Sequence, residues 1–171
     1  MTGPFDIGAI DTMIGFPTPD MRATYEFITK QTKDKESKEE FQFPAEYMFK
    51  DVPEKSLQGA SDPVGVTLEA MDRVGIEIGL IGVGADDDQN ALRRYPDRFV
   101  ACSHVDPNHG VEAVRQLRRE HELFGTRAVG LFPAGFFPQV AINDPQMFPI
   151  YATCVELDIP RLERKSKRLN S

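Results

Sequence analysis

Residues 62–84, DPVGVTLEAMDRVGIEIGLIGVG, decide the fold because they spell out one complete helix followed by one buried strand. Asp62 can accept hydrogen bonds from the free amides of a helix start, and Pro63 suits the first helical position. Gly75 is a favourable residue just past a helix end. The apolar positions between them fall at helical spacing, at Val64, Leu68, Met71 and Val74. IEIGLIGVG (76–84) is then typical of a strand buried on both faces.

The same arrangement recurs downstream. A short helix is predicted over 86–95, and Asp106-Pro107 and Asp144-Pro145 begin two more. On the last of these, we expect Phe148, Tyr151 or Ala152, and Val155 to face inward. Further strands are predicted within 5–14, over 98–105 and 126–132, and from 157–160 onward.

Strands that alternate with helices predict βαβ units and a parallel sheet, wound by right-handed crossovers into a barrel or an open sheet. GVGADDDQN (82–90) does not fit the spacing G-x-G-x-x-G, so the sequence gives little support to a dinucleotide site.

Composition narrows the function classes. The 171 residues suit one domain, and the formal net charge of −7 argues against a nucleic-acid partner. Two cysteines in apolar surroundings are typical of a reducing compartment. We find no signal-peptide pattern and no apolar stretch long enough for a membrane span, so we expect a cytoplasmic protein with no membrane partner. The basic stretch 161–171, RLERKSKRLNS, differs from the acidic residues before it.

Three segments carry a resemblance to a known family: LEAMDRVGIEIGLIGVG, YPDRFVACSHVDPNHGVEAVRQLRRE and GTRAVGLFPAGFFPQVAINDPQMFPIYATCVELDIP. They resemble the amidohydrolase-related (amidohydrolase 2) family, which includes aminocarboxymuconate-semialdehyde decarboxylase and resorcylate decarboxylases. The resemblance implies an α/β fold, a partial TIM-type barrel with about strands 1–4 and the start of strand 5. Residues 1–160 would form this half barrel, with 16–61 as a long loop after strand 1 and 161–171 as a tail unlike the family.

The resemblance also implies a function: a metal-dependent hydrolase or decarboxylase of a small organic acid, ester or amide. Its active site would lie at the mouth formed by the carboxyl ends of the strands, with a divalent metal such as zinc as cofactor. Asp11 matches a family carboxylate, but the two strand 1 histidines of the family fall on Met13 and Gly15. The family's next ligand, a histidine after strand 5, has no counterpart in PRLERKSKRLNS. We therefore assign no metal ligand in this sequence.

Asp11 and His104 are the best available acid and base for catalysis, since each is predicted at the carboxyl end of a strand. The competing interpretations are structural and are favoured: Asp11 would hydrogen-bond the backbone near its strand end. Asp106 would cap the next helix while His104 contacts a loop.

Phe132, Phe136 and Phe137 follow a strand and are expected either to bind substrate or to cover an apolar core, with neither favoured. Cys102 has no histidine at nucleophile spacing, so a catalytic thiol is not expected.

An alternative to an enzyme is a non-catalytic half barrel or binding subunit. Its open strand edges would pair in a homo-oligomer or with a complementing second half. The abrupt change at residue 161 raises two further hypotheses, a frameshift or premature stop, and a basic arm with a purpose of its own. A small-molecule substrate is expected for the enzyme, but the sequence does not identify it.

Overall fold

The computed structural model describes residues 8–18 and 60–163, and its centre is a five-stranded sheet in which every neighbouring pair is parallel. The strands follow one another in chain order across the sheet. Their bounds are β1 (Ala9–Asp11), β2 (Ile76–Ile81), β3 (Phe99–His104), β4 (Ala128–Leu131) and β5 (Arg161–Glu163). Parallel strands in sequential order, joined by helices, are half of a TIM barrel, and the predicted fold class is confirmed.

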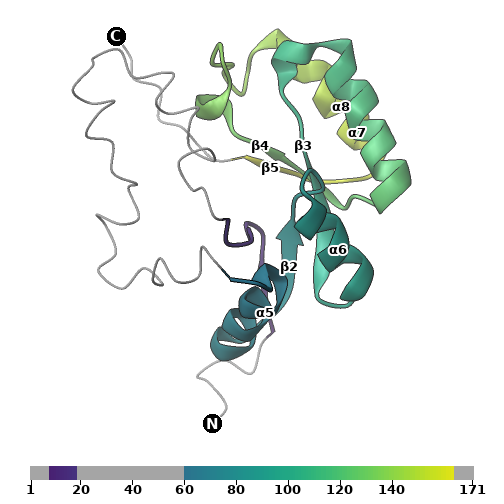
Figure 1. The fold of residues 1–171 in the computed structure, drawn as a ribbon. Helices are drawn as coiled ribbons and strands as arrows, with labels where there is room; N and C mark the ends of the chain where they lie inside the picture. The colour runs from purple at the N-terminus through teal and green to yellow at the C-terminus, as the bar shows by residue number, and fades with distance from the viewer. Residues whose placement is uncertain (1–7, 19–59, 164–171) are drawn as a thin grey trace, which may run out of the picture.

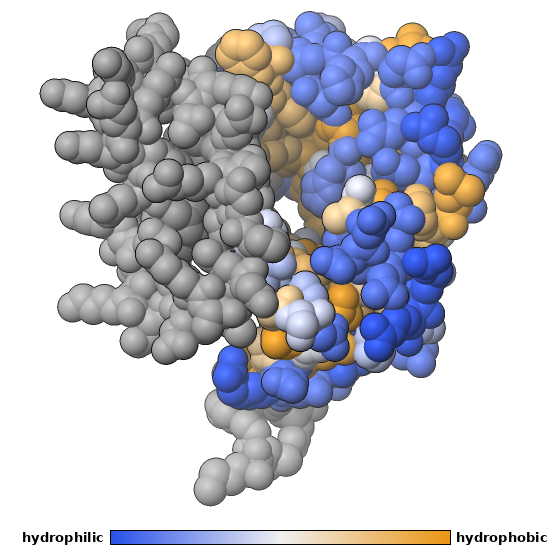
Figure 2. Space-filling view, viewed as in Figure 1, coloured by the Kyte–Doolittle hydropathy of each residue, from blue (hydrophilic) through white to orange (hydrophobic). Residues whose placement is uncertain are grey.

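Four α-helices connect the described strands. They are α5 (Pro63–Val74), α6 (Asp86–Arg94), α7 (Val111–Phe124) and α8 (Phe148–Glu156). Short 3₁₀ turns η2 (Pro107–His109), η3 (Pro133–Gly135) and η4 (Pro145–Met147) lie between them. Figure 1 shows α6, α7 and α8 on one side of the strands, and Figure 2 shows that their outer surface is mostly hydrophilic. The helices therefore bury one face against the sheet and present the other to solvent.

The helix boundaries follow the local sequence. The Asp62 carboxylate accepts a hydrogen bond from the Gly65 amide at 3.0 Å, and Pro63 occupies the first turn of α5. Gly75 and Gly125 end α5 and α7 in the left-handed region, with φ of 78° and 62°, where a side chain would be strained. Asp106 accepts from the Asn108 amide at 2.9 Å and caps the 3₁₀ turn η2, whereas the helix predicted to begin at Asp106-Pro107 starts only at Val111.

The apolar core lies between the strands and the helices. One cluster joins β4 to α7 and α8 through Val129, Leu117 and Ile150, all essentially inaccessible to solvent. A second cluster joins β2 to α5 through Ile81 and Met71. Because side chains alternate along a strand, the residues between these core positions face the inside of the barrel. That inner face holds the site described below.

The fifth strand does not begin where the sequence predicted. We expected it from residues 157–160, but Leu157 still donates to the Thr153 carbonyl at the end of α8, and Asp158 turns the chain with φ of 54°. Strand β5 then starts at Arg161, inside the stretch we had assigned to the basic tail. Residues 16–61 and 161–171 lie mostly outside the described residues, so their roles as insertion and tail stay predictions.

The predicted inner face of the last helix is partly wrong. Phe148 is 56% exposed and Val155 is 81% exposed. The core contacts come instead from Ile150 and Cys154, with Tyr151 packed partly against them. The reason is that the α-helix begins at Phe148, after a separate 3₁₀ turn that Asp144 caps. This turn shifts the phase of the helix relative to one that starts at Asp144.

Candidate active site

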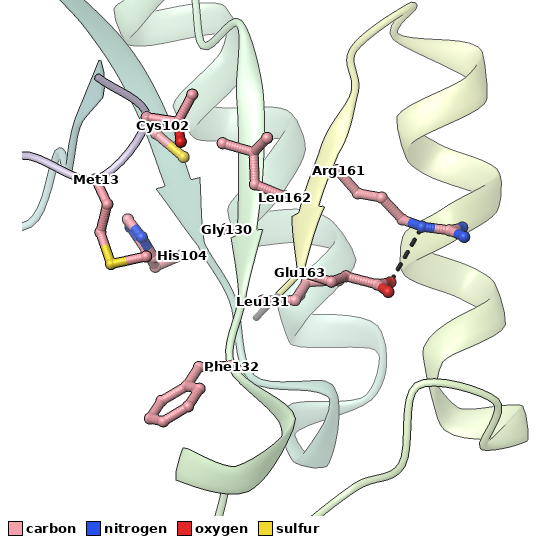
Figure 3. Close-up of a pocket in the computed structure, with 10 residues that line it drawn as sticks. Met13, Cys102, His104, Gly130, Leu131, Phe132, Arg161, Leu162 and Glu163 are labelled. Atoms are coloured by element: carbon pink, nitrogen blue, oxygen red, sulfur yellow. Dashed lines mark ion pairs between the residues drawn. The ribbon is translucent and has the colours of Figure 1, made fainter. Parts of the chain in front are cut away.

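A pocket of about 510 Å³ opens at the carboxyl ends of β3, β4 and β5. It lies where the active sites of TIM barrels are built. Figure 3 shows its walls, which combine one imidazole with sulfur-containing, aromatic and aliphatic side chains. The lining residues are Thr12, Met13, Cys102, His104, Gly130, Leu131, Phe132, Arg161, Leu162 and Glu163.

His104 is the last residue of β3, and its ring lies in a gap left by glycine on the neighbouring strand. Its register partner on β4 is Gly130. A Cβ atom added at Gly130 would stand 2.6 Å from His104 Nε2 and 2.7 Å from Cδ2. Ordinary carbon contacts are about 3.5–4.0 Å. Only glycine at position 130 leaves the imidazole where it is, so the Nε2 edge borders the pocket-lining backbone of β4.

Gly82, just after β2, creates a similar opening near the other ring nitrogen. A Cβ at Gly82 would lie 3.9 Å from His104 Nδ1 and 3.0 Å from Asp88 Oδ2. Asp88 belongs to the first turn of α6 and accepts a hydrogen bond from the Ala85 amide at 3.1 Å. Burial raises the pKa of the Asp88 carboxyl, while the nearby charge of His104 lowers it in part. The sequence alone does not single out Asp88, although the run ADDDQN at a helix start is a visible signal.

The structure does not bring Asp11 and His104 together. Asp11 pairs in register with Gly79, and a Cβ at Gly79 would contact Met71 of α5. Asp11 therefore shares the helix-covered face of the sheet, whereas His104 belongs to the inner face. The Asp11 carboxylate accepts from the Met13 amide at 2.9 Å. This backbone contact is the structural interpretation that the sequence favoured, and Asp11 does not line the pocket.

The three candidate substrate-binding aromatics separate in the structure. Phe132 follows β4 and lines the pocket. Phe136 is 9% exposed and packs in the core cluster of α7 and α8. Phe137 is 70% exposed and is not among the lining residues. The apolar-core interpretation therefore applies to Phe136. Phe132 alone of the three borders the pocket, and its role in binding substrate stays a prediction.

The charged residues of β5 point away from the pocket interior. Arg161 and Glu163 form an ion pair at 3.0 Å on the side of α8, as Figure 3 shows. The Arg161 guanidinium lies 4.1 Å from the centre of the Tyr151 ring, and the Tyr151 hydroxyl is 2.9 Å from Glu163 Oε1. Leu162, between them, is in register with Gly130 and faces inward. Among the described lining residues, His104 and Cys102 are therefore the titratable side chains on the inner face of the sheet.

Two sulfur atoms border the same space. Cys102 is two residues before His104 on the inner face of β3, and burial raises the pKa of its thiol to about 11. The thiol is therefore protonated at neutral pH and is a weak nucleophile. Figure 3 shows the Met13 side chain beside the His104 ring. The pocket wall formed by Met13 and Cys102 is thus neutral and largely apolar.

The donor set does not fit a metal centre of the kind the resemblance implies. Within residues 8–18 and 60–163, no group of three or more His, Cys, Asp or Glu side chains could hold an ion. Met13 offers a thioether, which is a poor ligand for hard or borderline divalent ions. Gly15 has no side chain.

Comparison with known proteins places this arrangement among solved barrels. The chain matches no protein-family model and no curated protein sequence. A 5-carboxyvanillate decarboxylase from Novosphingobium aromaticivorans, solved with bound manganese and 3-methoxy-4-hydroxy-5-nitrobenzoic acid, superposes with a TM-score of 0.62 at 19% identity. The match covers 94% of this chain and 51% of that one. The described fold is half a TIM barrel.

Two further structures agree. An uncharacterised TIM-barrel protein from Bordetella bronchiseptica has a TM-score of 0.57 at 23% identity, covering 95% of this chain and 57% of its own. A 2,6-dihydroxybenzoate decarboxylase from Rhizobium has a TM-score of 0.57 at 17% identity, covering 96% and 52%. The chain thus spans about half the length of these three structures. Similarity at this identity establishes the fold, and activity has to be argued from the site.

None of the described helices is both long and apolar enough to cross a bilayer.

Proposed function

We propose that the pocket at the carboxyl ends of the strands belongs to an amidohydrolase-related, decarboxylase-like enzyme that acts on a small organic acid with an aromatic ring. The position of His104 carries the proposal, because it places an ionisable ring among apolar walls at the catalytic end of the barrel. The sequence resemblance and the fold of two kinds of decarboxylase support the same reaction class.

The pocket chemistry suits the loss of CO₂ from an electron-rich ring. The protonated imidazole of His104 would donate its proton to the ring carbon that bears the carboxylate. The bond from that carbon to the carboxylate then breaks, its electron pair restores the aromatic ring, and CO₂ leaves. The products are the neutral arene, which bears hydrogen where the carboxylate stood, CO₂ and a neutral imidazole, so atoms and charge balance. Phe132 and Leu162 supply apolar surface for the ring of the substrate.

The experiment compares CO₂ release from a panel of hydroxylated benzoates by the wild-type chain, His104→Gln and His109→Gln. 2,6-Dihydroxybenzoate and 5-carboxyvanillate belong in the panel. His109 lies in η2 and does not line the pocket, so it is the matched control. We expect His104→Gln to lower the rate about 10²–10⁴-fold, the range for a lost general acid. Equal activity of the two variants would overturn the role of His104, and no CO₂ release by wild type would overturn the proposed reaction.

A separate proposal concerns partners. Within the described sheet, β1 and β5 each pair with one neighbour, so each leaves one edge open to another strand. We propose that these edges pair with a second copy or with a complementing half barrel that encloses the pocket. Sedimentation of the purified chain tests this: a dimer or a larger assembly supports the proposal, and a monomer at every concentration contradicts it.

A further inference from the structure

His104 and Asp88 approach one another across Gly82. His104 ends β3, and Asp88 lies in the first turn of α6, the helix that precedes β3 in the chain. A Cβ atom added at Gly82 would stand 3.9 Å from Nδ1 of His104 and 3.0 Å from Oδ2 of Asp88. The two atoms are therefore at most the sum of these distances apart, 6.9 Å. That separation admits either direct attraction or one bridging water.

The Asp88 carboxylate is held in place by its own helix. Oδ2 accepts from the Ala85 amide at 3.1 Å, and the Gly84 amide also stabilises the charged form. A carboxylate fixed by backbone amides keeps its direction better than one on a free side chain. Asp88 is thus a fixed negative charge beside the Nδ1 edge of the ring.

The groups that act on Asp88 come from two elements. Asp87, on the same helix, raises the pKa of Asp88, and His104, on β3, lowers it. The largest effect is burial, which raises the pKa of the carboxyl. A partly buried carboxylate interacts with a nearby cation more strongly than an exposed one, because solvent screens it less.

The two ring nitrogens of His104 face different neighbours. Nδ1 faces Gly82 and Asp88, whereas Nε2 faces Gly130, which lines the pocket. A carboxylate on the Nδ1 side favours the tautomer that carries its proton on Nδ1. Nε2 is then the nitrogen that exchanges a proton with a bound molecule.

We propose that Asp88 is the positioning residue of His104: it keeps Nδ1 protonated, so that Nε2 delivers the proton at the pocket. This inference rests on the proposed function for its catalytic meaning, but the contact itself can be tested without substrate. Asp88 does not line the pocket, so it would act through His104 and not on the substrate.

The first test follows the Asp88 side-chain carboxyl by carbon NMR during a pH titration, in the wild type and in His104→Gln. Removing the imidazole removes a contribution that lowers the pKa of Asp88, so we expect the titration midpoint to move to higher pH. His109→Gln is the control and should leave the midpoint unchanged. An unchanged midpoint in His104→Gln would overturn the proposal.

The second test uses nitrogen NMR of the His104 ring in Asp88→Asn, which retains an oxygen to accept from the Ala85 amide. We expect the share of the neutral ring that carries its proton on Nδ1 to fall in this variant. Gly82→Ala, which inserts a methyl group between the two side chains, should change the ring signals as well. Gly15→Ala is the matched control, because its Cβ would meet nothing within 4 Å and Gly15 is not among the groups that act on Asp88. Ring signals that are identical in Asp88→Asn and the wild type would contradict the proposal.

Activity then separates the two claims. If the NMR effects appear while His104→Gln remains fully active, the contact is real and the proposed function is wrong. If His104→Gln is inactive and Asp88→Asn changes neither ring nor rate, the function stands and the role of Asp88 is wrong. If both are right, Asp88→Asn lowers kcat with little change in KM and alters the pH profile of the rate.

Discussion

Replacing Gly130 by alanine should displace the His104 ring without unfolding the protein. The added Cβ would stand 2.6 Å from Nε2 and 2.7 Å from Cδ2. Since carbon contacts need about 3.5 Å or more, the ring has to retreat by about 1 Å. The obstructed atoms belong to the far end of an exposed side chain, so the ring can move into open space.

Two opposing effects set the change in stability. A strained side-chain rotamer at His104 would cost about 0.5–1.5 kcal/mol. Alanine in a strand is favoured over glycine by about 0.5–1 kcal/mol, because the unfolded chain loses less backbone freedom. We therefore expect the free energy of unfolding to change by less than about 1 kcal/mol. A catalytic group misplaced by about 1 Å can lower a rate about 10²-fold.

The assay combines urea denaturation with proton–carbon NMR of the histidine rings. We expect a near-wild-type unfolding midpoint, a clear shift of the His104 signal, and unchanged signals from His109 and His121. Gly84→Ala provides the control for a glycine replaced in open space. A His104 signal at its wild-type position in Gly130→Ala would refute the close approach of the ring to β4.

Three other predictions concern the core and two titrating groups. The Leu117 side chain is 0% exposed, so Leu117→Ala should lower the free energy of unfolding, measured by chemical denaturation, by about 2–5 kcal/mol. Leu123 on the same helix is 68% exposed, and Leu123→Ala should change it by less than about 0.5 kcal/mol. Equal effects would contradict the described buried face of α7. The pKa of about 11 at Cys102 predicts that iodoacetamide does not alkylate this thiol at pH 8 unless the protein is unfolded. Alkylated Cys102 in the native protein, detected by mass spectrometry, would contradict this prediction. Burial and the hydrogen bond to Glu163 raise the pKa of Tyr151 to about 12. In the unfolded chain the pKa of a tyrosine is about 10, so between these values the folded protein keeps a proton that the unfolded chain loses. This contribution to stability is complete below pH 10 and is lost as pH rises toward 12. Tyrosinate absorbance should show one tyrosine that ionises late in the wild type and is missing in Tyr151→Phe. The absence of such a difference between the two proteins would argue against the prediction.

The parts of the fold that the sequence predicted well are those with local causes. Asp62 caps α5 and Gly75 ends it because both effects depend on a few neighbouring residues. The start of β5 was misplaced because its three residues, RLE, lack an apolar run. Tertiary contacts compensate for this polarity, since Arg161 lies over the Tyr151 ring and pairs with Glu163. No local pattern contains that information.

The site was predictable in part for the same reason. His104 was recognisable because it ends an apolar strand. The face of the sheet on which Asp11 lies was not predictable, because a register irregularity between Ala9 and Ile10 determines the side to which its carboxylate points. The approach of Asp88 to His104 across Gly82, and the placement of the ring against Gly130, depend on two glycines at or just after the strands that flank β3. The spacing of residues in the sequence does not show that Gly82 and Gly130 both lie beside the His104 ring.

The most direct test of the account is whether an aromatic acid binds beside His104. Nitrogen-labelled protein is titrated with 2,6-dihydroxybenzoate while the Gly130 amide and the His104 ring are observed by NMR. We expect saturable shifts of both signals, which His104→Gln weakens and His109→Gln leaves intact. Binding that is equally strong in both variants, or shifts confined to residues outside the pocket, would contradict the claim that His104 is the centre of this site.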